Sequence, residues 1–190
     1  MTERHRRSNI GAYVIFDRDG TLIDHVHHLV NLQLVNLKTD LGPALQTLTL
    51  AGFKLGVITN QSVIGRRLGA SDEVVRINEL IEQHLKSFDV AFDFIYICPH
   101  LPEDECNCRK PQIALGLRAV LEFQLNPEHS FMVGDTESDM IFGRNLGCKT
   151  IQLKGGAEKS AFADYYSDTL DSAARWILTE IDRRIFEWGN

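Results

Sequence analysis

The chain has 190 residues, which suits one domain (residues 1–190) with enough length to bury a core. Hydrophobic residues make up 44% and charged residues 24%, as is typical of a soluble globular protein. The net charge of −6 argues against a nucleic-acid-binding protein, which usually presents a basic face. It still allows an anionic substrate, because a pocket can be locally positive.

The sequence contains no segment that resembles a membrane span or a secretory signal. Its longest apolar runs, such as residues 55–58, are far shorter than the roughly 20 residues that a span needs. Residues 1–11 lack the apolar centre of a signal, and we expect them to form a flexible tail. We therefore expect a cytoplasmic protein, in which a tight cysteine cluster indicates a metal site more often than a disulfide.

Apolar strand patterns and helical patterns alternate from the first strand onward. Residues 13–16 form a short β-rich run, after which a helix is expected to begin at Pro43 and end at Gly52. Residues 53–59 are the second predicted strand. Ser71 or Asp72 is expected to cap the next helix, whose apolar residues repeat with a period of 3.6.

The second half of the chain continues the alternation. Residues 92–97 are the third predicted strand, and a helix with Ala114, Leu117 and Leu121 on its apolar side follows Pro111. The remaining elements are predicted at 130–134 (strand), 136–146 (helix), 149–153 (strand) and 170–187 (helix). This alternation predicts an α/β fold with a parallel sheet and helices on both faces.

Ligands of such sheets bind at the carboxyl ends of the strands, so the polar residues found there are candidates for a site. Asp17 and Asp19 follow the first strand, Thr59 and Asn60 the second, and Asp135 the fourth. These residue types suit phosphate or metal chemistry.

The segment DRDGT (17–21) has the composition of a phosphoryl-transfer site. Asp17 could attack phosphorus as a nucleophile, and Asp19 could protonate the leaving oxygen and later activate water. Two carboxylates so close repel each other unless a cation neutralises them, and Mg²⁺ prefers oxygen ligands. Asp135 would supply a further carboxylate, and Asp139 would lie one helical turn further on.

A bound phosphate also needs hydrogen-bond donors. Thr59 and Asn60 could supply a hydroxyl and backbone N–H groups, and Lys110 a positive charge. Arg109 could make a two-pronged contact with a second anionic group.

These four ordered segments resemble the four motifs of the haloacid dehalogenase (HAD) superfamily, over essentially the whole chain. The resemblance implies a Rossmann-like sheet and a two-step phosphotransfer to water, with Asp17 as nucleophile and Asp19 as general acid/base. It implies that Thr59 and Lys110 hold the phosphoryl group. It also implies that Asp17, Asp135 and the backbone carbonyl of Asp19 hold Mg²⁺, with Asp139 in a supporting role.

Residues 98–108 read CPHLPEDECNC and contain four potential zinc ligands. Three thiolates and one imidazole complete a tetrahedral zinc shell, which indicates a structural rather than a catalytic metal. Such a zinc-bound loop would fix Arg109 and Lys110, which follow it directly. The four ligands are Cys98, His100, Cys106 and Cys108. Cys148 stands apart and is expected in the core.

The chain is similar both to D-glycero-D-manno-heptose-1,7-bisphosphate phosphatases and to the histidinol-phosphatase domain of a bifunctional histidine-biosynthesis enzyme. The zinc loop resembles the histidinol-phosphatase version, whereas NQSVIGRR (60–67) resembles the heptose version and places Arg66 where those enzymes have an arginine. Arg66, Arg67 and Arg109 could bind the distal phosphate of a bisphosphate. We therefore expect a Mg²⁺-dependent phosphatase that removes the 7-phosphate of the heptose bisphosphate, with histidinol phosphate or another small phosphomonoester as the alternative.

A second alternative is a HAD-like binding module that has lost hydrolysis. The presence of Asp17, Asp19, Lys110 and Asp135 favours the enzyme. Residues 61–92 are predicted to hold one helix, and no large cap domain is expected between the motifs. The expected partner is a small phosphorylated metabolite, with no nucleic acid or membrane involved, and a monomer is the default state.

Overall fold

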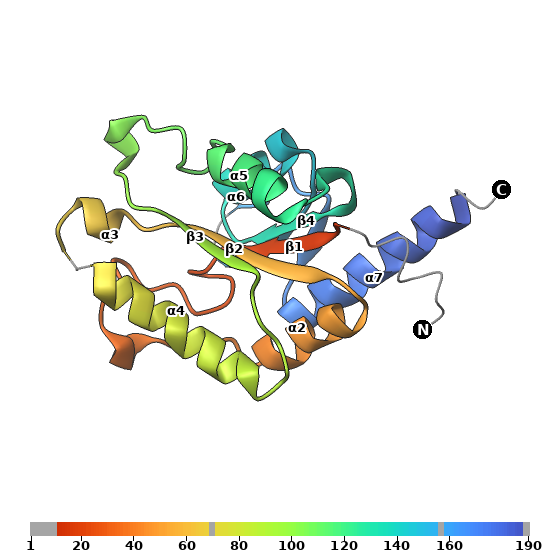
Figure 1. Cartoon of the computed structure of the whole chain (residues 1–190), viewed down its shortest axis with the longest axis horizontal. Coiled ribbons are helices and arrows are strands. Elements are labelled where there is room, and N and C mark those ends of the chain that lie inside the picture. Colours follow the sequence, from red (N-terminus) through yellow and green to blue (C-terminus); the bar gives the residue numbers. More distant parts are fainter. Residues whose placement is uncertain (1–10, 69–70, 156–157, 188–190) are drawn as a thin grey trace.

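The computed structural model describes residues 11–68, 71–155 and 158–187, with side chains described as far as residue 181. Apart from Gly11, the tail predicted for residues 1–11 lies outside the described residues. Figure 1 shows a central sheet with α5 and α6 above it and α2, α4 and α7 below it. The predicted α/β class with helices on both faces is confirmed.

The described residues form a six-stranded sheet in which every pair of neighbouring strands is parallel. The five predicted strands are present, with some ends shifted by one or two residues. A sixth strand was not predicted, because three residues are too few for a period of two to be recognised. The strands are β1 (Tyr13–Phe16), β2 (Lys54–Asn60), β3 (Phe94–Cys98), β4 (Phe131–Gly134), β5 (Lys149–Leu153) and β6 (Tyr165–Ser167).

The helices connect these strands and largely match the prediction. They are α2 (Leu41–Leu50), α3 (Ser62–Gly65), α4 (Ser71–Lys86), α5 (Ala114–Phe123), α6 (Glu137–Leu146) and α7 (Leu170–Glu187). Short 3-10 helices lie at Leu32–Leu34, Pro102–Asp104 and Pro127–His129. None of the helices within the described ranges has the length and apolar character needed to cross a membrane.

Two helix starts differ from the prediction, and one short helix was not predicted. Helix α2 begins at Leu41, so that Pro43 occupies the third position, where a missing N–H still costs no intrahelical bond. Ser71 and Asp72 lie inside the first turn of α4, and the capping position before them falls outside the described residues. The short helix α3 was not predicted, so residues 61–92 hold two helices rather than one.

Side chains of the strands alternate between two hydrophobic cores, as the pleat of a strand requires. In β1, Val14 and Phe16 belong to the core with α2, α4 and α7, whereas Tyr13 and Ile15 belong to the core with α5 and α6. Each fully buried side chain of this size stabilises the fold by about 1.5–3 kcal/mol. The two cores hold the sheet rigidly between its helical layers.

The predicted apolar side of α5 is wrong. The face that packs on the sheet and on α6 instead carries the small residues Gly116 and Ala119, and a Cβ at Gly116 would lie 2.7 Å from Leu146. Apolar residues occur all round this helix, so their spacing is compatible with either of two buried faces. Helix α6 packs closely against α5, and the face with the small residues leaves room for it. The residues on the exposed side are Ala114, Leu117 and Leu121.

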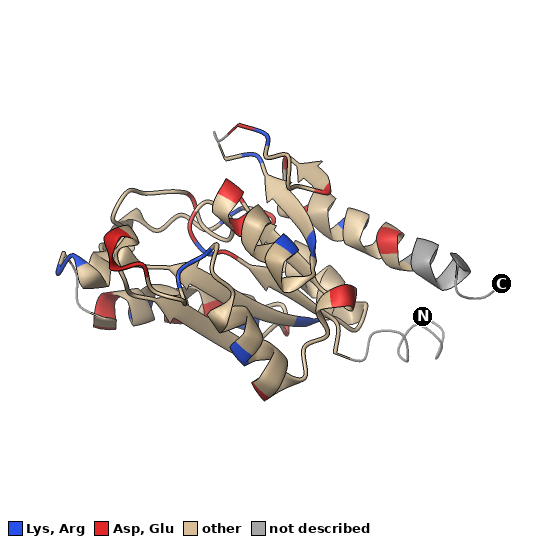
Figure 2. Cartoon of the chain, turned by 90° about the horizontal axis from the view of Figure 1, so that it is seen from above, with Lys and Arg blue, Asp and Glu red and all other residues tan. Residues whose placement is uncertain are grey.

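The order of the strands places a crevice at the centre of the sheet. The order is β3-β2-β1-β4-β5-β6, so the chain proceeds from β1 to one edge and then returns to β4 and proceeds to the other. Such a reversal opens a site at the carboxyl ends of the two central strands. Lys, Arg, Asp and Glu residues are interspersed over the helices and loops around it (Figure 2).

Candidate active site

Three segments that are distant in sequence bring their charged groups together at this crevice. Asp17 directly follows β1, Asp135 directly follows β4, and Asp139 lies in the first turn of α6. These three buried carboxylates each offer an oxygen within 4.8 Å of the others. Lys110, from the loop before α5, places its Nζ 2.6 Å from Asp17 Oδ1 and 2.7 Å from Asp139 Oδ1. The predicted meeting of residues 17, 110 and 135 therefore occurs.

The ammonium group of Lys110 is fully engaged. Its third partner is the carbonyl oxygen of Ile58, 2.7 Å away, and an ammonium has only three N–H donors. Burial would lower the pKa of Lys110, but Asp139 and Asp17 outweigh it and raise the pKa, so the group is charged. A phosphoryl oxygen at Lys110 would have to replace or share one of these partners.

The three carboxyl groups of the site outnumber the single positive group, Lys110, that faces them. Burial raises the pKa of Asp17 to about 6, a shift that Lys110 opposes and that Asp139 and Asp19 reinforce. Burial raises the pKa of Asp135 to about 7, with Asp17 and Asp139 adding to it. Asp135 Oδ1 is buried without a hydrogen-bond partner. An unpaired buried oxygen among three carboxylates and one lysine fits a site for a divalent cation.

Local sequence features bring these groups close together. Gly20 has a φ of +83°, and a Cβ there would lie 2.1 Å from Asp135 Oδ2, so only glycine allows the two loops to approach. Asp139 Oδ2 accepts hydrogen bonds from Thr136 N (3.1 Å) and Thr136 Oγ1 (2.6 Å) at the start of α6. Asp139 thus caps its helix with one oxygen and holds Lys110 with the other, which leaves Asp135 as the carboxylate with an unpaired oxygen.

The carboxylate of Asp19 lies apart from this cluster. It accepts hydrogen bonds from Arg18 Nη2 (2.9 Å) and from Gln61 Nε2 (2.5 Å). The cluster that could hold a metal ion contains Asp139 rather than the Asp19 side chain. Any contribution of residue 19 to that metal therefore falls to its backbone carbonyl, as the family resemblance implies.

Thr59 and Asn60 are the last two residues of β2 and lie beside this site, but their side chains have different roles. Thr59 is buried, and its Oγ1 accepts a hydrogen bond from Gln61 Nε2 at 3.0 Å. The Asn60 side chain instead pairs with the backbone of Lys110, accepting from its N–H at 3.0 Å and donating to its carbonyl at 3.2 Å. Asn60 therefore positions the lysine loop, a role that its place after a strand did not reveal.

The cysteine loop gathers its four predicted ligands. His100 Nδ1 lies 3.1 Å from Cys108 Sγ, and the three sulfur atoms lie 3.3–3.6 Å from one another. Disulfide bonds are about 2.05 Å long, so these cysteines are free thiols. The separations are close to the edges of a tetrahedron around zinc, about 3.5–3.8 Å for bonds of about 2.0–2.3 Å. The set fits a four-coordinate zinc site. Cys148 is buried in the core, as predicted.

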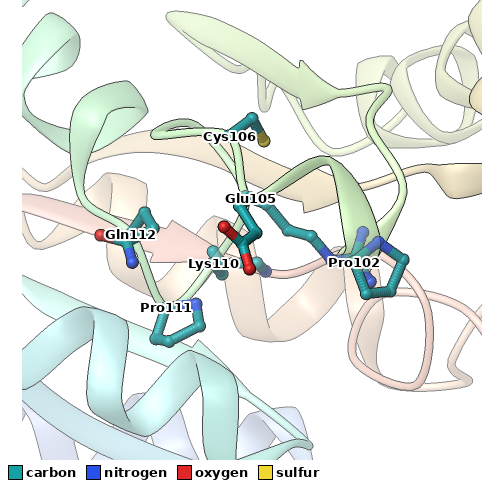
Figure 3. A pocket seen from close by; sticks show the side chains of 7 residues that line it. Pro102, Glu105, Cys106, Lys110, Pro111 and Gln112 are labelled. Carbon is teal, nitrogen blue, oxygen red and sulfur yellow. The ribbon is translucent and has the colours of Figure 1, made fainter.

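Two arginines of the predicted site occupy different positions. Arg109 lines a pocket of about 470 Å³ together with Lys110, Glu105 and Gln112 (Figure 3), and its Nη1 donates to the carbonyl oxygen of His100 at 3.2 Å. Arg66 is exposed at the end of α3 and is not among the residues that line this pocket. Arg109 therefore lines the same pocket as Lys110, and Arg66 does not.

The sheet, its crevice and this arrangement of aspartates and lysine define a phosphatase of the HAD superfamily. A family model described as HAD-hydrolase-like matches residues 107–175, which include Lys110, Asp135 and Asp139. In the solved structures, the D,D-heptose 1,7-bisphosphate phosphatase from B. bronchiseptica, complexed with magnesium and phosphate, shares the fold. It has a TM-score of 0.81 and 23% identity, covering 89% of this chain and 99% of that one.

Curated relatives narrow the class to a family. The D-glycero-beta-D-manno-heptose-1,7-bisphosphate 7-phosphatase of Pasteurella multocida is 37% identical over 153 residues, which are 75% of this chain and 82% of the relative. The histidine biosynthesis bifunctional protein HisB of Blochmanniella floridana is 34% identical over 142 residues, 73% of this chain but only 40% of that protein. The chain belongs to the heptose-1,7-bisphosphate 7-phosphatase family.

Proposed function

We propose that the chain removes the 7-phosphate of D-glycero-D-manno-heptose 1,7-bisphosphate. The observation that carries the proposal is the contact of 2.6 Å between Lys110 Nζ and Asp17 Oδ1, beside the unpaired oxygen of Asp135. In this arrangement the carboxylate of Asp17 is paired with the Lys110 ammonium and lies beside a site suited to a divalent cation. The names of the relatives that share two thirds or more of their length with this chain support the choice of substrate.

The chemistry proceeds in two steps on the side chains of this chain. A carboxylate oxygen of Asp17 forms a bond to phosphorus as the ester P–O bond breaks, and Asp19 donates a proton to the departing alkoxide oxygen. Asp19 then takes a proton from the water that attacks the aspartyl-phosphate, releasing phosphate and restoring Asp17. The Thr59 hydroxyl and the Lys110 ammonium hold the phosphoryl oxygens.

Two metals belong to the proposal. Asp17, Asp135 and the backbone carbonyl of Asp19 would hold Mg²⁺, which when bound neutralises the carboxylates and the phosphoryl group. The raised pKa values of Asp17 and Asp135 and the unpaired Asp135 Oδ1 support this site. Zinc would close the loop of residues 98–108 and so hold Arg109 and Lys110 in place.

The remaining parts of the proposal concern the distal phosphate and the setting. Arg109 would bind the phosphate that is not cleaved, since it lines the same pocket as Lys110. Arg66 would join it only if the substrate reaches the end of α3. We place the enzyme in the cytoplasm as a monomer that acts on a small phosphorylated metabolite, without nucleic acid or membrane.

Histidinol phosphate is the second candidate, because the cysteine loop resembles the histidinol-phosphatase version and HisB proteins align over 73% of the chain. The deciding experiment measures kcat/KM with Mg²⁺ for both anomers of the heptose bisphosphate and for histidinol phosphate on one preparation. We expect the heptose bisphosphate to be preferred by at least about 10²-fold, because a site with charged groups discriminates against a substrate that leaves them without a partner. A preference for histidinol phosphate would reverse the assignment, and equally feeble turnover of all three would exclude both substrates.

A further inference from the structure

Gln61, which follows the strand-end residues Thr59 and Asn60, lies between two segments of the site. Its side chain is buried, with 4% of the residue exposed. Its Nε2 donates to Asp19 Oδ2 at 2.5 Å and to Thr59 Oγ1 at 3.0 Å, which uses both of its N–H groups. Its Oε1 accepts from Arg18 Nη2 at 2.8 Å. A single amide therefore joins the side chains that follow β1 to those that end β2.

The orientation of this amide is determined by Arg18. A guanidinium has five donors and no acceptor, so the Gln61 atom that faces it must be the oxygen. A flipped amide would turn its N–H groups toward Arg18 and its oxygen toward the Asp19 carboxylate, and both contacts would be repulsive. Gln61 can therefore present only its donors to Asp19 and Thr59.

Arg18 is itself held firmly. It is 1% exposed, and it donates through Nε and Nη2 to Asp19 and through Nη1 to Asn78 Oδ1 at 3.3 Å on α4. Apolar side chains enclose the space beside it; they are Leu22, Val57, Ile81, Phe92 and Ile95. The orientation of Gln61 is thus fixed by a buried cation rather than by exposed groups that could rearrange.

This network has two consequences for the reacting groups. Because Thr59 Oγ1 accepts from Gln61, its own hydrogen points elsewhere and can donate to another acceptor, such as a phosphoryl oxygen. Because Arg18 and Gln61 both donate to Asp19, the direction of that carboxylate is set before substrate binds. The backbone N–H of Gln61 also donates to the carbonyl oxygen of Cys98 at 2.7 Å, which ties the amide to the first residue of the cysteine loop.

We propose that Gln61 is a positioning residue for phosphate-ester hydrolysis, acting through the Asp19 carboxylate and the Thr59 hydroxyl, with Arg18 fixing its orientation. The inference rests on the proposed function, in which Asp19 protonates the leaving oxygen and Thr59 holds the phosphoryl group. Gln61 touches neither the phosphoryl group nor the leaving oxygen in this scheme, so its effect depends on how much the reaction needs Asp19.

The test compares two esters that differ in this need. The alkyl ester at O7 of heptose 1,7-bisphosphate requires a proton on its leaving oxygen, whereas the nitrophenolate of 4-nitrophenyl phosphate leaves without one. Gln61→Glu keeps the size of the side chain and an oxygen for Arg18, but it places an oxygen against Asp19. The rate of leaving-group release in the first turnover is measured, because the second step, in which Asp19 activates water, is the same for both esters. We expect this rate to fall about 10²-fold for the alkyl ester, the scale of a general acid, and no more than about 10-fold for the aryl ester. The KM should rise for both esters through the loss of Thr59 positioning.

Two further variants keep the test decisive if Gln61→Glu folds poorly. Gln61→Met removes the amide without adding charge and should show the same difference between esters at a smaller size. Gln46→Leu is the matched control, because it removes a half-buried glutamine on α2 whose Nε2 donates to the carbonyl oxygen of Phe88, just after the end of α4. It should leave the ratio of the two first-turnover rates unchanged.

The Asp19→Asn variant distinguishes a failure of the positioning role of Gln61 from a failure of the proposed acid role of Asp19. If Asp19→Asn discriminates between the esters in the first turnover and folded Gln61 variants slow both first turnovers equally, the positioning role is overturned while the acid role stands. If Asp19→Asn slows both first turnovers equally, the acid role is overturned, and the role of Gln61 falls with it. Combining Asp19→Asn with Gln61→Met should add no further discrimination, since coupled residues are not additive.

Discussion

The two clusters suited to metals are built in opposite ways. The cysteine loop draws its four ligands from residues 98–108 of one connection, whereas the carboxylate site draws its groups from the ends of β1 and β4, from α6 and from the loop before α5. Ligand types and spacing suffice to recognise the first, because the chain around it is short. The second exists only when the sheet is assembled, since Asp17 and Lys110 are 93 residues apart.

The two clusters nevertheless meet at Lys110. This lysine stands two residues beyond Cys108, and the side chain of Arg109 reaches back to the His100 carbonyl. The loop therefore supports the site without supplying a reacting group. Variants of each cluster should separate these contributions: changes at the carboxylate site should abolish chemistry, and changes at the loop should weaken it.

The largest effect is expected at Asp17. Asp17→Asn keeps the shape of the side chain but removes the nucleophile, so Mg²⁺-dependent phosphate release should fall by about 10³-fold or more. The variant should remain folded, because an amide still accepts a hydrogen bond from Lys110. Activity at the unmodified level in a phosphate-release assay would remove Asp17 from the role of nucleophile.

Removal of the buried lysine should be the most destabilising change. Lys110→Met leaves Asp17 and Asp139 buried without their counter-charge, and breaking a buried pair on one side costs about 3–5 kcal/mol of unfolding free energy. Chemical denaturation measures this loss. Lys154→Met is the matched control, because Lys154 is exposed and pairs with exposed Asp168, so it should cost less than about 1 kcal/mol. Equal losses for both variants would refute the buried ion cluster.

The pH dependence of stability should separate Asp135 from ordinary surface carboxylates. Its folded pKa is raised to about 7, so the folded protein without Mg²⁺ binds a proton that the unfolded chain releases near pH 4. The contribution of Asp135 to the unfolding free energy is therefore present below about pH 4 and is lost as the pH rises to about 7. Asp135→Asn should remove a decline on the order of a few kcal/mol over this window. Saturating Mg²⁺ should abolish it too, and parallel pH curves for both proteins without Mg²⁺ would contradict the shift.

The smallest effect is expected in the cysteine loop. Cys106→Ser should lower bound zinc from one per chain to a small fraction, and it should reduce kcat/KM by about 10-fold, as is common when a supporting contact is lost. Circular dichroism should show the sheet intact. Ser138→Ala, a change of a small half-buried side chain outside the loop, should leave zinc content unchanged. Full zinc occupancy in Cys106→Ser would remove Cys106 from the ligand set.

Much of the fold could be predicted because strands and helices leave periodic signals. The positions of Asp17 and Asp135 followed from two rules: these residues end strands, and parallel strands present their ends at one edge. Strand β6 escaped because three residues carry no period, and the face of α5 was misassigned because leucines occupy its exposed side as well. The packing of α6 determines which face of α5 is buried. The sequence pattern of α5 alone carries no information about the helix that packs against it.

The polar connections of the site could not be predicted in the same way. Gln61, Asn60 and Asn78 look like ordinary turn or surface residues in the sequence. Their roles arise from hydrogen bonds to residues 42, 50 and 60 positions away. Arg18, between two aspartates, would be expected to face solvent, yet it is among the most deeply buried side chains. Such roles depend on how the loops pack after the sheet forms.

The central claim is that four distant segments converge so that the carboxylate of residue 17 receives a phosphoryl group. The most direct test is to mix the Asp19→Asn variant with Mg²⁺ and 4-nitrophenyl phosphate, whose leaving group needs no proton, quench it in acid within a single turnover, and map the phosphorylated peptide by mass spectrometry. We expect the phosphoryl group on Asp17, because loss of the residue that activates water slows its release. Phosphate released in that turnover with no phosphorylated peptide, or with the label on another residue, would contradict the claim.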